Sequence, residues 1–196
     1  MKINSGTLRG MGIIMPKNQI TRPTLSKVRA AIFNILGNDL KGLVFWDLFA
    51  GSGAIGLSAL SLGAKSVVLV EQDIAACKAL KQNIEEAKKR FVKSEAVLIE
   101  PILLASELKK VWSRLSKLTP PDLIWADPPY VESLSWASFL KSELPHFVNE
   151  GTLLMMEIQS DEVKQAEQKS LLVDPQWDLV KTKQYGNCSL VIWRKT

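Results

Sequence analysis

The sequence predicts an α/β fold, built on a mostly parallel seven-stranded sheet with helices on both faces. From residue 43 onward, short apolar runs alternate with longer segments of helical periodicity, and a glycine-rich turn joins the first run to the first helix. The last two apolar runs have no helix between them. They are therefore expected to pair as an antiparallel C-terminal hairpin.

Residues 1–38 precede this pattern and are expected to form a small extension of their own. The stretch from Lys2 to Pro16 predicts a β-hairpin, with Leu8-Arg9-Gly10 near its turn. Thr24 is expected to cap a following helix, whose apolar residues fall on one face. The predicted organisation is an N-terminal hairpin and helix over residues 1–38, then a main domain over residues 39–196.

The main domain is expected to hold seven strands and five helices. The strands are expected near residues 43–47, 66–71, 96–99, 122–127, 151–158, 178–184 and 188–194. The helices are expected near residues 53–62, 73–90, 102–117, 133–144 and 160–168. Ligands bind at the carboxyl ends of the strands in such a sheet. Candidate site residues are therefore sought where the strands end.

A glycine-rich turn follows the first expected strand, in the sequence Asp47-Leu48-Phe49-Ala50-Gly51-Ser52-Gly53. Its glycines let a ligand approach the backbone, and the helix that follows offers free N–H groups. Glu71 ends the next strand about 20 residues later, a spacing typical of an acid that binds ribose hydroxyls. The candidate cofactor contacts are Asp47, Phe49, Ala50, Gly51, Gly53, Glu71 and Gln72.

The pattern Gly51-x-Gly53-x-x-Gly56 also fits a dinucleotide fingerprint, so an NAD-dependent dehydrogenase is an alternative. Asp47 argues against this alternative, because its carboxylate would face an anionic pyrophosphate. It suits a ligand with a positive group at that point, such as the ammonium of S-adenosylmethionine. That cofactor also has a ribose for Glu71 and carries no phosphates.

A second motif, Asp127-Pro128-Pro129-Tyr130, follows the buried apolar run Leu123–Ala126. The Asp127 carboxylate can accept a hydrogen bond from an exocyclic amine, and a carbonyl before or within the Pro-Pro pair can accept another. Two acceptors would orient the lone pair of the amine nitrogen for attack, while the Tyr130 ring offers a face for a planar base. The alternative is that Pro-Pro merely ends a strand and opens a loop.

The composition excludes several classes of protein. One histidine and two cysteines without metal or disulfide spacing argue against a metal site and against Ser-His or Cys-His catalysis. Cys77 and Cys188 are interpreted as reduced thiols of a cytoplasmic protein. No apolar run approaches the roughly 20 residues of a membrane span.

Positive charge is concentrated at the N-terminus of a chain whose net charge is +5. The segment from Met1 to Asn38 has no acidic residue, and its basic residues are Lys2, Arg9, Lys17, Arg22, Lys27 and Arg29. Such a segment is a candidate surface for nucleic-acid phosphates. A solvated basic surface with no partner is the alternative.

Taken together, these motifs resemble the bacterial 16S rRNA guanine-N2 methyltransferase family of the RsmD type. The match rests on DLFAGSGAIGLSAL and DPPY, and on an N-terminal stretch with Gly6-Thr7-Leu8-Arg9-Gly10, Arg22-Pro23-Thr24 and Val28-Arg29. Tyr185-Gly186 before the last strand extends it over nearly the whole chain. The resemblance implies a Rossmann-like class I methyltransferase fold.

The resemblance also implies an activity and roles for the candidate residues. The expected reaction is methyl transfer from S-adenosylmethionine to the N2 amine of a guanine in small-subunit rRNA, free or in an assembled or partly assembled subunit. Asp127, Pro128, Pro129 and Tyr130 would hold the target base, and Arg9, Arg22, Lys27 and Arg29 would contact RNA phosphates. A cytoplasmic monomer without metal is expected. Adenine-N6 methylation of DNA or RNA is an alternative, because such enzymes share DPPY.

One segment departs from the family pattern. The family has Asp-Ala or Asn-Ala after its third strand, where the side chain touches the adenine of the cofactor. Here the third expected strand, residues 96–99, is followed by Glu100-Pro101. Whether Glu100 takes over the adenine contact is left open by the sequence, because Pro101 changes the backbone and removes a donor.

Overall fold

The computed structural model describes residues 1–16, 23–94, 96–97, 99–168 and 172–196. The side chains of residues 23–27, 29, 130 and 166–168 also lie outside this description. The chain divides into two compact units, Met1–Thr119 and Pro120–Thr196. Within the described segments, none of the helices has the length and apolar character needed to span a bilayer.

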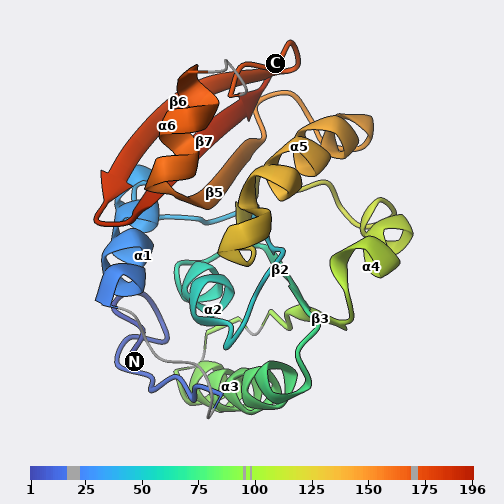
Figure 1. The fold of residues 1–196 in the computed structure, drawn as a ribbon. Helices are drawn as coiled ribbons and strands as arrows, with labels where there is room; N and C mark the ends of the chain where they lie inside the picture. The colour runs from blue at the N-terminus through green and yellow to red at the C-terminus, as the bar shows by residue number, and fades with distance from the viewer. Residues whose placement is uncertain (17–22, 95, 98, 169–171) are drawn as a thin grey trace. The chain divides into compact units, whose positions relative to one another are not determined.

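Unit 1 contains the N-terminal segment, three parallel strands and the helices that connect them (Figure 1). In chain order its described elements are α1 (Pro23–Ile35), β1 (Val44–Asp47), α2 (Ala54–Ser61), β2 (Ser66–Glu71), α3 (Ile74–Lys93), β3 (Ile102–Ala105) and α4 (Leu108–Leu115). β2 pairs in parallel with β1 on one side and with β3 on the other. This register brings the carboxyl ends Asp47, Glu71 and Ala105 to one edge.

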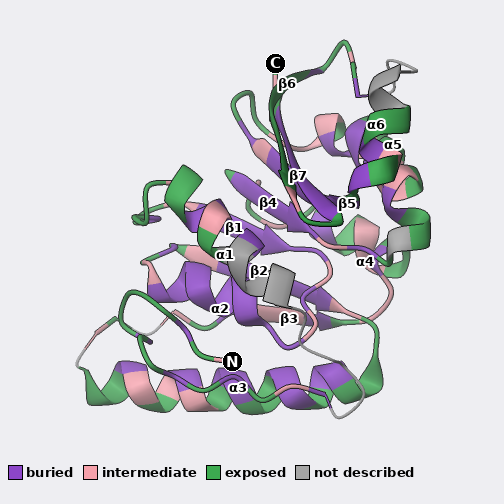
Figure 2. Cartoon of the chain, turned by 60° about the vertical axis from the view of Figure 1, so that its left-hand side comes forward, coloured by how far each residue is buried: buried purple, intermediate pink, exposed green. Residues whose placement is uncertain are grey.

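Burial follows the apolar pattern of these elements. Every residue of β1 and every residue of α2 is buried, so α2 is purple along its length in Figure 2. α3 instead buries one apolar face and exposes the other, and the side chain of Asp73 caps its first turn by accepting from the Ala76 N–H at 2.7 Å. The glycine turn therefore lies between two elements that are wholly buried.

The N-terminal segment forms a short antiparallel pairing, in agreement with the hairpin expected over Lys2 to Pro16. Lys2 bridges Gly12, and the Ile3 N–H donates to the Met11 carbonyl at 3.0 Å. Its turn is bonded to the end of α2, because the Leu8 N–H donates to Ser61 Oγ at 2.8 Å. The segment is thus part of unit 1.

Unit 2 contains a mixed group of four strands and the helices beside them. In chain order its described elements are β4 (Leu123–Ala126), the 3₁₀ turn η1 (Tyr130–Glu132), α5 (Ser133–Glu143), the 3₁₀ turn η2 (Leu144–His146), β5 (Leu153–Gln159), α6 (Ser160–Gln168), β6 (Trp177–Tyr185) and β7 (Cys188–Lys195). β4 and β5 are parallel, whereas β7 runs antiparallel to both β5 and β6. The predicted antiparallel C-terminal hairpin is confirmed, as is the mostly parallel seven-stranded α/β fold.

Two predicted elements between α3 and α4 are wrong. The third strand is Ile102–Ala105, not residues 96–99, and the helix expected over 102–117 is confined to Leu108–Leu115. Both apolar runs are short, and periodicity alone does not distinguish a short strand from the start of a helix. Residues 102–105 form a strand because they pair with β2, where Ile102 to Ala105 lie opposite Val68 to Glu71.

Candidate functional site

The turn after β1 has the tight backbone that its glycines predict. Gly51 and Gly53 have φ values of 54° and 81°, in the left-handed region that favours glycine. A Cβ atom on Gly53 would lie 2.3 Å from the Leu80 Cδ1 atom, so a side chain there would collide with α3. The turn therefore requires glycine for its conformation and for close packing.

Glu71 is hydrogen-bonded directly to this turn. The Gly51 N–H donates to Glu71 Oε2 at 2.7 Å, and the N–H groups of Gln72 and Asp73 donate to Oε1 at 2.8 and 2.7 Å. The structure therefore brings together two residues that the sequence placed about 20 positions apart. Each carboxylate oxygen can accept more than one hydrogen bond, so Oε2 keeps a lone pair for a hydroxyl group.

Asp47 lies beneath the turn and is almost completely buried, with 1% of its surface exposed. Its Oδ2 atom accepts from the Gly56 N–H at 3.0 Å, which connects the end of β1 to α2. Among the described residues, Oδ1 has no hydrogen-bond partner. The pKa of Asp47 is raised to about 7, chiefly by burial; the negative charge of Glu71 contributes to the rise, and the N–H groups of Gly56 and Phe49 oppose it.

The remaining predicted cofactor residues surround this pair. Ala50 is buried, and its N–H donates to the Val70 carbonyl at 2.8 Å, which holds the turn against β2. Phe49 is half-buried, and Gln72 is exposed beside Glu71. The predicted cofactor residues are therefore all within one unit, along the carboxyl ends of β1 and β2.

Asn83 is a residue of this region that the sequence analysis missed. It is fully buried on α3, and its Nδ2 donates to the carbonyls of Ser52 and Ile14, both at 2.9 Å. Its Oδ1 accepts from the Ile14 N–H at 2.9 Å. This amide bonds the glycine turn to the N-terminal segment; an Asn within an otherwise apolar helix face was the available signal.

The motif Asp127-Pro128-Pro129-Tyr130 follows β4 in unit 2. Asp127 is half-buried, Pro128 is buried and Pro129 is exposed, so the segment emerges from the core at this point. The Pro129 carbonyl accepts from the Glu132 N–H at 2.9 Å and begins the turn η1. The side chain of Tyr130 lies outside the described part of the structure, so its expected stacking role stays a prediction.

Glu157 is a second residue that sequence reasoning did not assign. In the parallel register of β4 and β5, Ala126 lies opposite Met156. Asp127 is the next residue after Ala126 and Glu157 is the next after Met156, so the two occupy matching positions on neighbouring strands. Residues at matching positions of neighbouring parallel strands share a face of the sheet. Glu157 is only 3% exposed, which is unusual for a carboxylate within an apolar strand.

The start of α5 is bonded to α6 in the same unit. Ser133, which is fully buried, donates from Oγ to Glu162 Oε2. Trp136 Nε1 donates to Glu132 Oε2 at 3.1 Å, one turn earlier. The residues after the motif therefore form a helical turn that is bonded on two sides.

The corrected position of β3 changes the interpretation of Glu100. Glu100 precedes β3 and forms an ion pair with Lys88 on the exposed side of α3. The residues that follow β3 are Ser106 and Glu107, next to Ala105, which lies opposite Glu71 in the register. The position after the third strand is thus Ser106, not Glu100.

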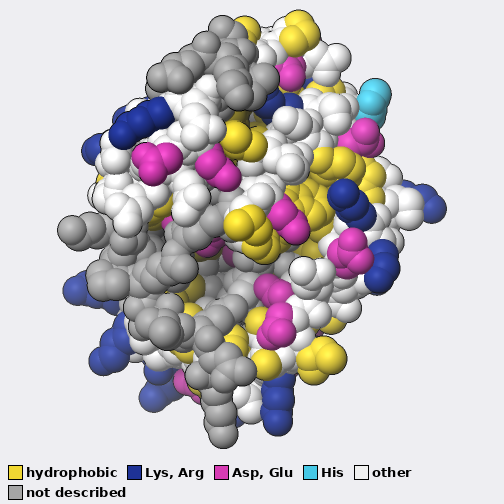
Figure 3. Space-filling model, in the orientation of Figure 1, with side chains coloured by type: hydrophobic (Ala, Val, Ile, Leu, Met, Phe, Trp, Pro, Cys, Tyr) yellow, Lys and Arg dark blue, Asp and Glu magenta, His cyan; other side chains and the backbone are white. Residues whose placement is uncertain are grey.

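The predicted RNA-binding residues are only partly described. Arg9 is exposed at the turn of the N-terminal segment, Arg22 lies outside the described residues, and Lys27 and Arg29 are on α1 with undescribed side chains. In Figure 3, Lys and Arg side chains follow the lower left edge of the view, where Figure 1 places both the N-terminal segment and α3. No group of His, Cys, Asp or Glu with metal-binding geometry occurs among the described residues.

Comparison with known proteins gives a family match over nearly the whole chain. The family model described as Conserved hypothetical protein 95 matches residues 1–194. "Ribosomal RNA small subunit methyltransferase D" of Buchnera aphidicola subsp. Acyrthosiphon pisum (strain APS) is 28% identical over 181 residues, 92% of this chain and 86% of that protein. Its namesake in Escherichia coli (strain K12) is 34% identical over 137 residues, 68% of this chain and 62% of that protein.

Solved structures show the same fold at lower identity. The rRNA methyltransferase aviRa from Streptomyces viridochromogenes is similar with a TM-score of 0.67 and 15% identity, over 93% of this chain and 88% of that one. At this identity the likeness concerns the fold alone. It confirms the Rossmann-like α/β architecture of the chain.

Proposed function

The chain belongs to the family described as Conserved hypothetical protein 95, and from this premise we propose its reaction. It transfers a methyl group from S-adenosylmethionine to the exocyclic N2 amine of a guanine in small-subunit rRNA. The names of two relatives support the coarser statement, methyl transfer to rRNA. The observation that carries the proposal is the 2.7 Å hydrogen bond from the Gly51 N–H to Glu71 Oε2, which joins the glycine turn to the acid that would bind the ribose.

The residues of unit 1 fit S-adenosylmethionine. Glu71 Oε2 would accept from a ribose hydroxyl, and the turn at Gly51 and Gly53 would lie along the methionine part. Asp47 Oδ1 is buried without a hydrogen-bond partner among the described residues, so a positive ammonium nearby would stabilise its charged form. When bound, the cofactor supplies an electrophilic methyl group on its sulfonium.

Ser106 and Glu107 extend this site in the proposal. They follow β3 immediately beside the end of β2, where Glu71 would hold the ribose. An adenine attached to that ribose would come within reach of them. They replace Glu100, whose ion pair with Lys88 is on the outer side of α3.

Unit 2 would supply the groups that orient the target amine. Asp127 would accept one hydrogen bond from it. The Pro128 carbonyl would accept another, since the Pro129 carbonyl is engaged by the Glu132 N–H. Two fixed acceptors would direct the nitrogen lone pair toward the methyl group, and alignment of this kind lowers barriers by several kcal/mol, up to about 10. The base would have to be unpaired or turned out of its helix.

A labelling experiment tests this proposal. The protein is incubated with methyl-labelled S-adenosylmethionine and, in parallel, undermodified small ribosomal subunits, free small-subunit rRNA or DNA, and the nucleosides are identified by mass spectrometry. We expect label in N2-methylguanosine. Label in N6-methyladenine would keep the role of Asp127 and overturn the substrate, and binding of NAD without S-adenosylmethionine would overturn both.

A further inference from the structure

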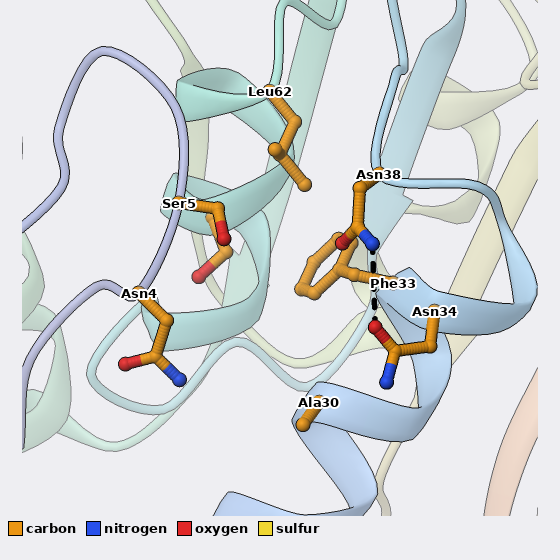
Figure 4. A pocket seen from close by; sticks show the side chains of 8 residues that line it. Asn4, Ser5, Ala30, Phe33, Asn34, Asn38 and Leu62 are labelled. Atoms are coloured by element: carbon orange, nitrogen blue, oxygen red, sulfur yellow. Dashed lines mark hydrogen bonds between the residues drawn. The ribbon is translucent and has the colours of Figure 1, made fainter.

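Unit 1 has a pocket away from the glycine turn, between the N-terminal segment, the C-terminal part of α1 and α2 (Figure 4). Its volume is about 220 Å³, smaller than the 300 Å³ or more typical of sites for drug-sized ligands. Six side chains define its chemistry: Asn4, Ser5, Ala30, Phe33, Asn34 and Asn38.

The polar groups of this pocket are amides and hydroxyls. Its lining among the described residues contains no Lys, Arg, Asp or Glu side chain. Each Asn amide offers both donors and an acceptor, and in Figure 4 the side chains of Asn34 and Asn38 are joined by a hydrogen bond of 3.2 Å. A neutral lining of this kind suits a planar polar ligand better than a phosphate or a carboxylate.

The backbone at the end of α1 positions this lining. The Asn38 N–H donates to the Phe33 carbonyl at 2.9 Å, and Asn38 has a φ of 55°, a conformation that Asn tolerates better than most side chains. This turn places the Asn38 amide beside the Phe33 ring, opposite Asn4 and Ser5 of the N-terminal segment (Figure 4). Phe33 is only 6% exposed and contributes an apolar wall, whereas Asn34 and Asn38 are exposed and offer their amides.

We propose that this pocket binds an unpaired nucleobase of the RNA substrate, other than the base that is methylated. Aromatic rings and amides are the groups that read single-stranded bases, by stacking and by hydrogen bonds to base edges. Arg9, exposed in the same N-terminal segment, would contact the adjoining phosphates. The inference rests on the proposed function for its RNA, but it concerns binding and not methyl transfer.

The first test measures affinity for undermodified small-subunit rRNA as a function of salt. The double variant Asn34→Ala with Asn38→Gly removes both amides, and glycine accepts the positive φ at position 38. We expect about tenfold weaker binding with an unchanged salt slope, because base contacts release no counterions. Arg9→Gln should instead lower the slope by about one. Asn149→Ala, an exposed site in unit 2, is the matched control and should bind as the parent does.

A second variant and a mapping experiment guard against a folding defect. Ala30→Phe adds a ring at an exposed position that lines the pocket, so it should fill the cavity and weaken binding by a similar factor. Irradiation of a complex with 4-thiouridine-substituted rRNA should crosslink the peptides that contain Phe33 or Asn4. Unchanged RNA affinity in both the double variant and Ala30→Phe, or crosslinks only outside the pocket, would contradict the proposal that this pocket binds a base. Crosslinks at the pocket without any methyl transfer would overturn the proposed function and leave the pocket standing.

Discussion

The glycine turn of unit 1 and the Asp127 segment of unit 2 are supported in different ways. The turn is buried from Ser52 onward, and three side chains hold it and the start of α2: Glu71 bonds Gly51, Asp47 bonds Gly56 and Asn83 bonds Ser52. The Asp127 segment emerges half-buried from β4, with an exposed Pro129. The first arrangement suits a rigid site for a small cofactor, whereas the second suits a segment that must stay accessible to a large substrate.

Removing the Asn83 amide should weaken the support of the glycine turn most strongly. Asn83→Ala removes the partner of the buried Ser52 carbonyl and of both backbone groups of Ile14, whose bonds are only part-buried. A buried unsatisfied group costs about 1–3 kcal/mol, and the more exposed Ile14 groups cost less because water can replace the amide. We expect the free energy of unfolding to fall by about 2–4 kcal/mol, measured by urea denaturation. Gln82→Ala, exposed on the same helix, should change it by less than about 0.5 kcal/mol. An equally small change for Asn83→Ala would show that the amide does not hold the turn.

In unit 2 the strand register singles out Glu157, which follows Met156 as Asp127 follows its partner Ala126. Glu157→Gln keeps the size of the side chain but replaces the carboxyl group by an amide, so we expect methyl transfer to slow by about tenfold with little change in cofactor affinity. Single-turnover transfer and equilibrium dialysis measure the two quantities. Gln159→Ala, exposed at the end of the same strand, is the control. A loss of cofactor affinity instead would place Glu157 with the glycine turn.

Asp47 predicts a smaller effect that depends on pH. Its pKa is about 7 when folded and 3.8 as a free side chain, so the folded state holds a proton more tightly between these values. The free energy of unfolding should therefore fall as pH rises through this window, by roughly 2 kcal/mol from pH 5 to pH 7. Asp47→Asn should remove this fall, as measured by denaturation at both pH values. Parallel pH curves for the two proteins would contradict the raised pKa.

Features that depend on a local residue pattern could be predicted from the sequence. Glycines that require positive φ and an acid about 20 residues later identified Gly51 and Glu71, which the structure joins by a hydrogen bond. The third strand was misplaced because the four apolar residues Ile102 to Ala105 are too few to show a strand pattern, and it is their pairing with β2 that makes them a strand. Asn83 was missed because its bonds reach residues 31 and 69 positions away. The helical pattern marks Asn83 as a polar residue on an apolar face, but it does not show which distant residues its amide binds.

The most direct test of the account compares Glu71→Ala with Asp127→Ala in the rate of methyl transfer as a function of S-adenosylmethionine concentration. If Glu71 holds the cofactor and Asp127 orients the amine, Glu71→Ala should raise KM and recover much of its rate at saturating cofactor. Asp127→Ala should keep its KM and lose about a hundredfold or more of its rate at every concentration. Equal losses of cofactor affinity in both variants would contradict the separate roles assigned to the two residues.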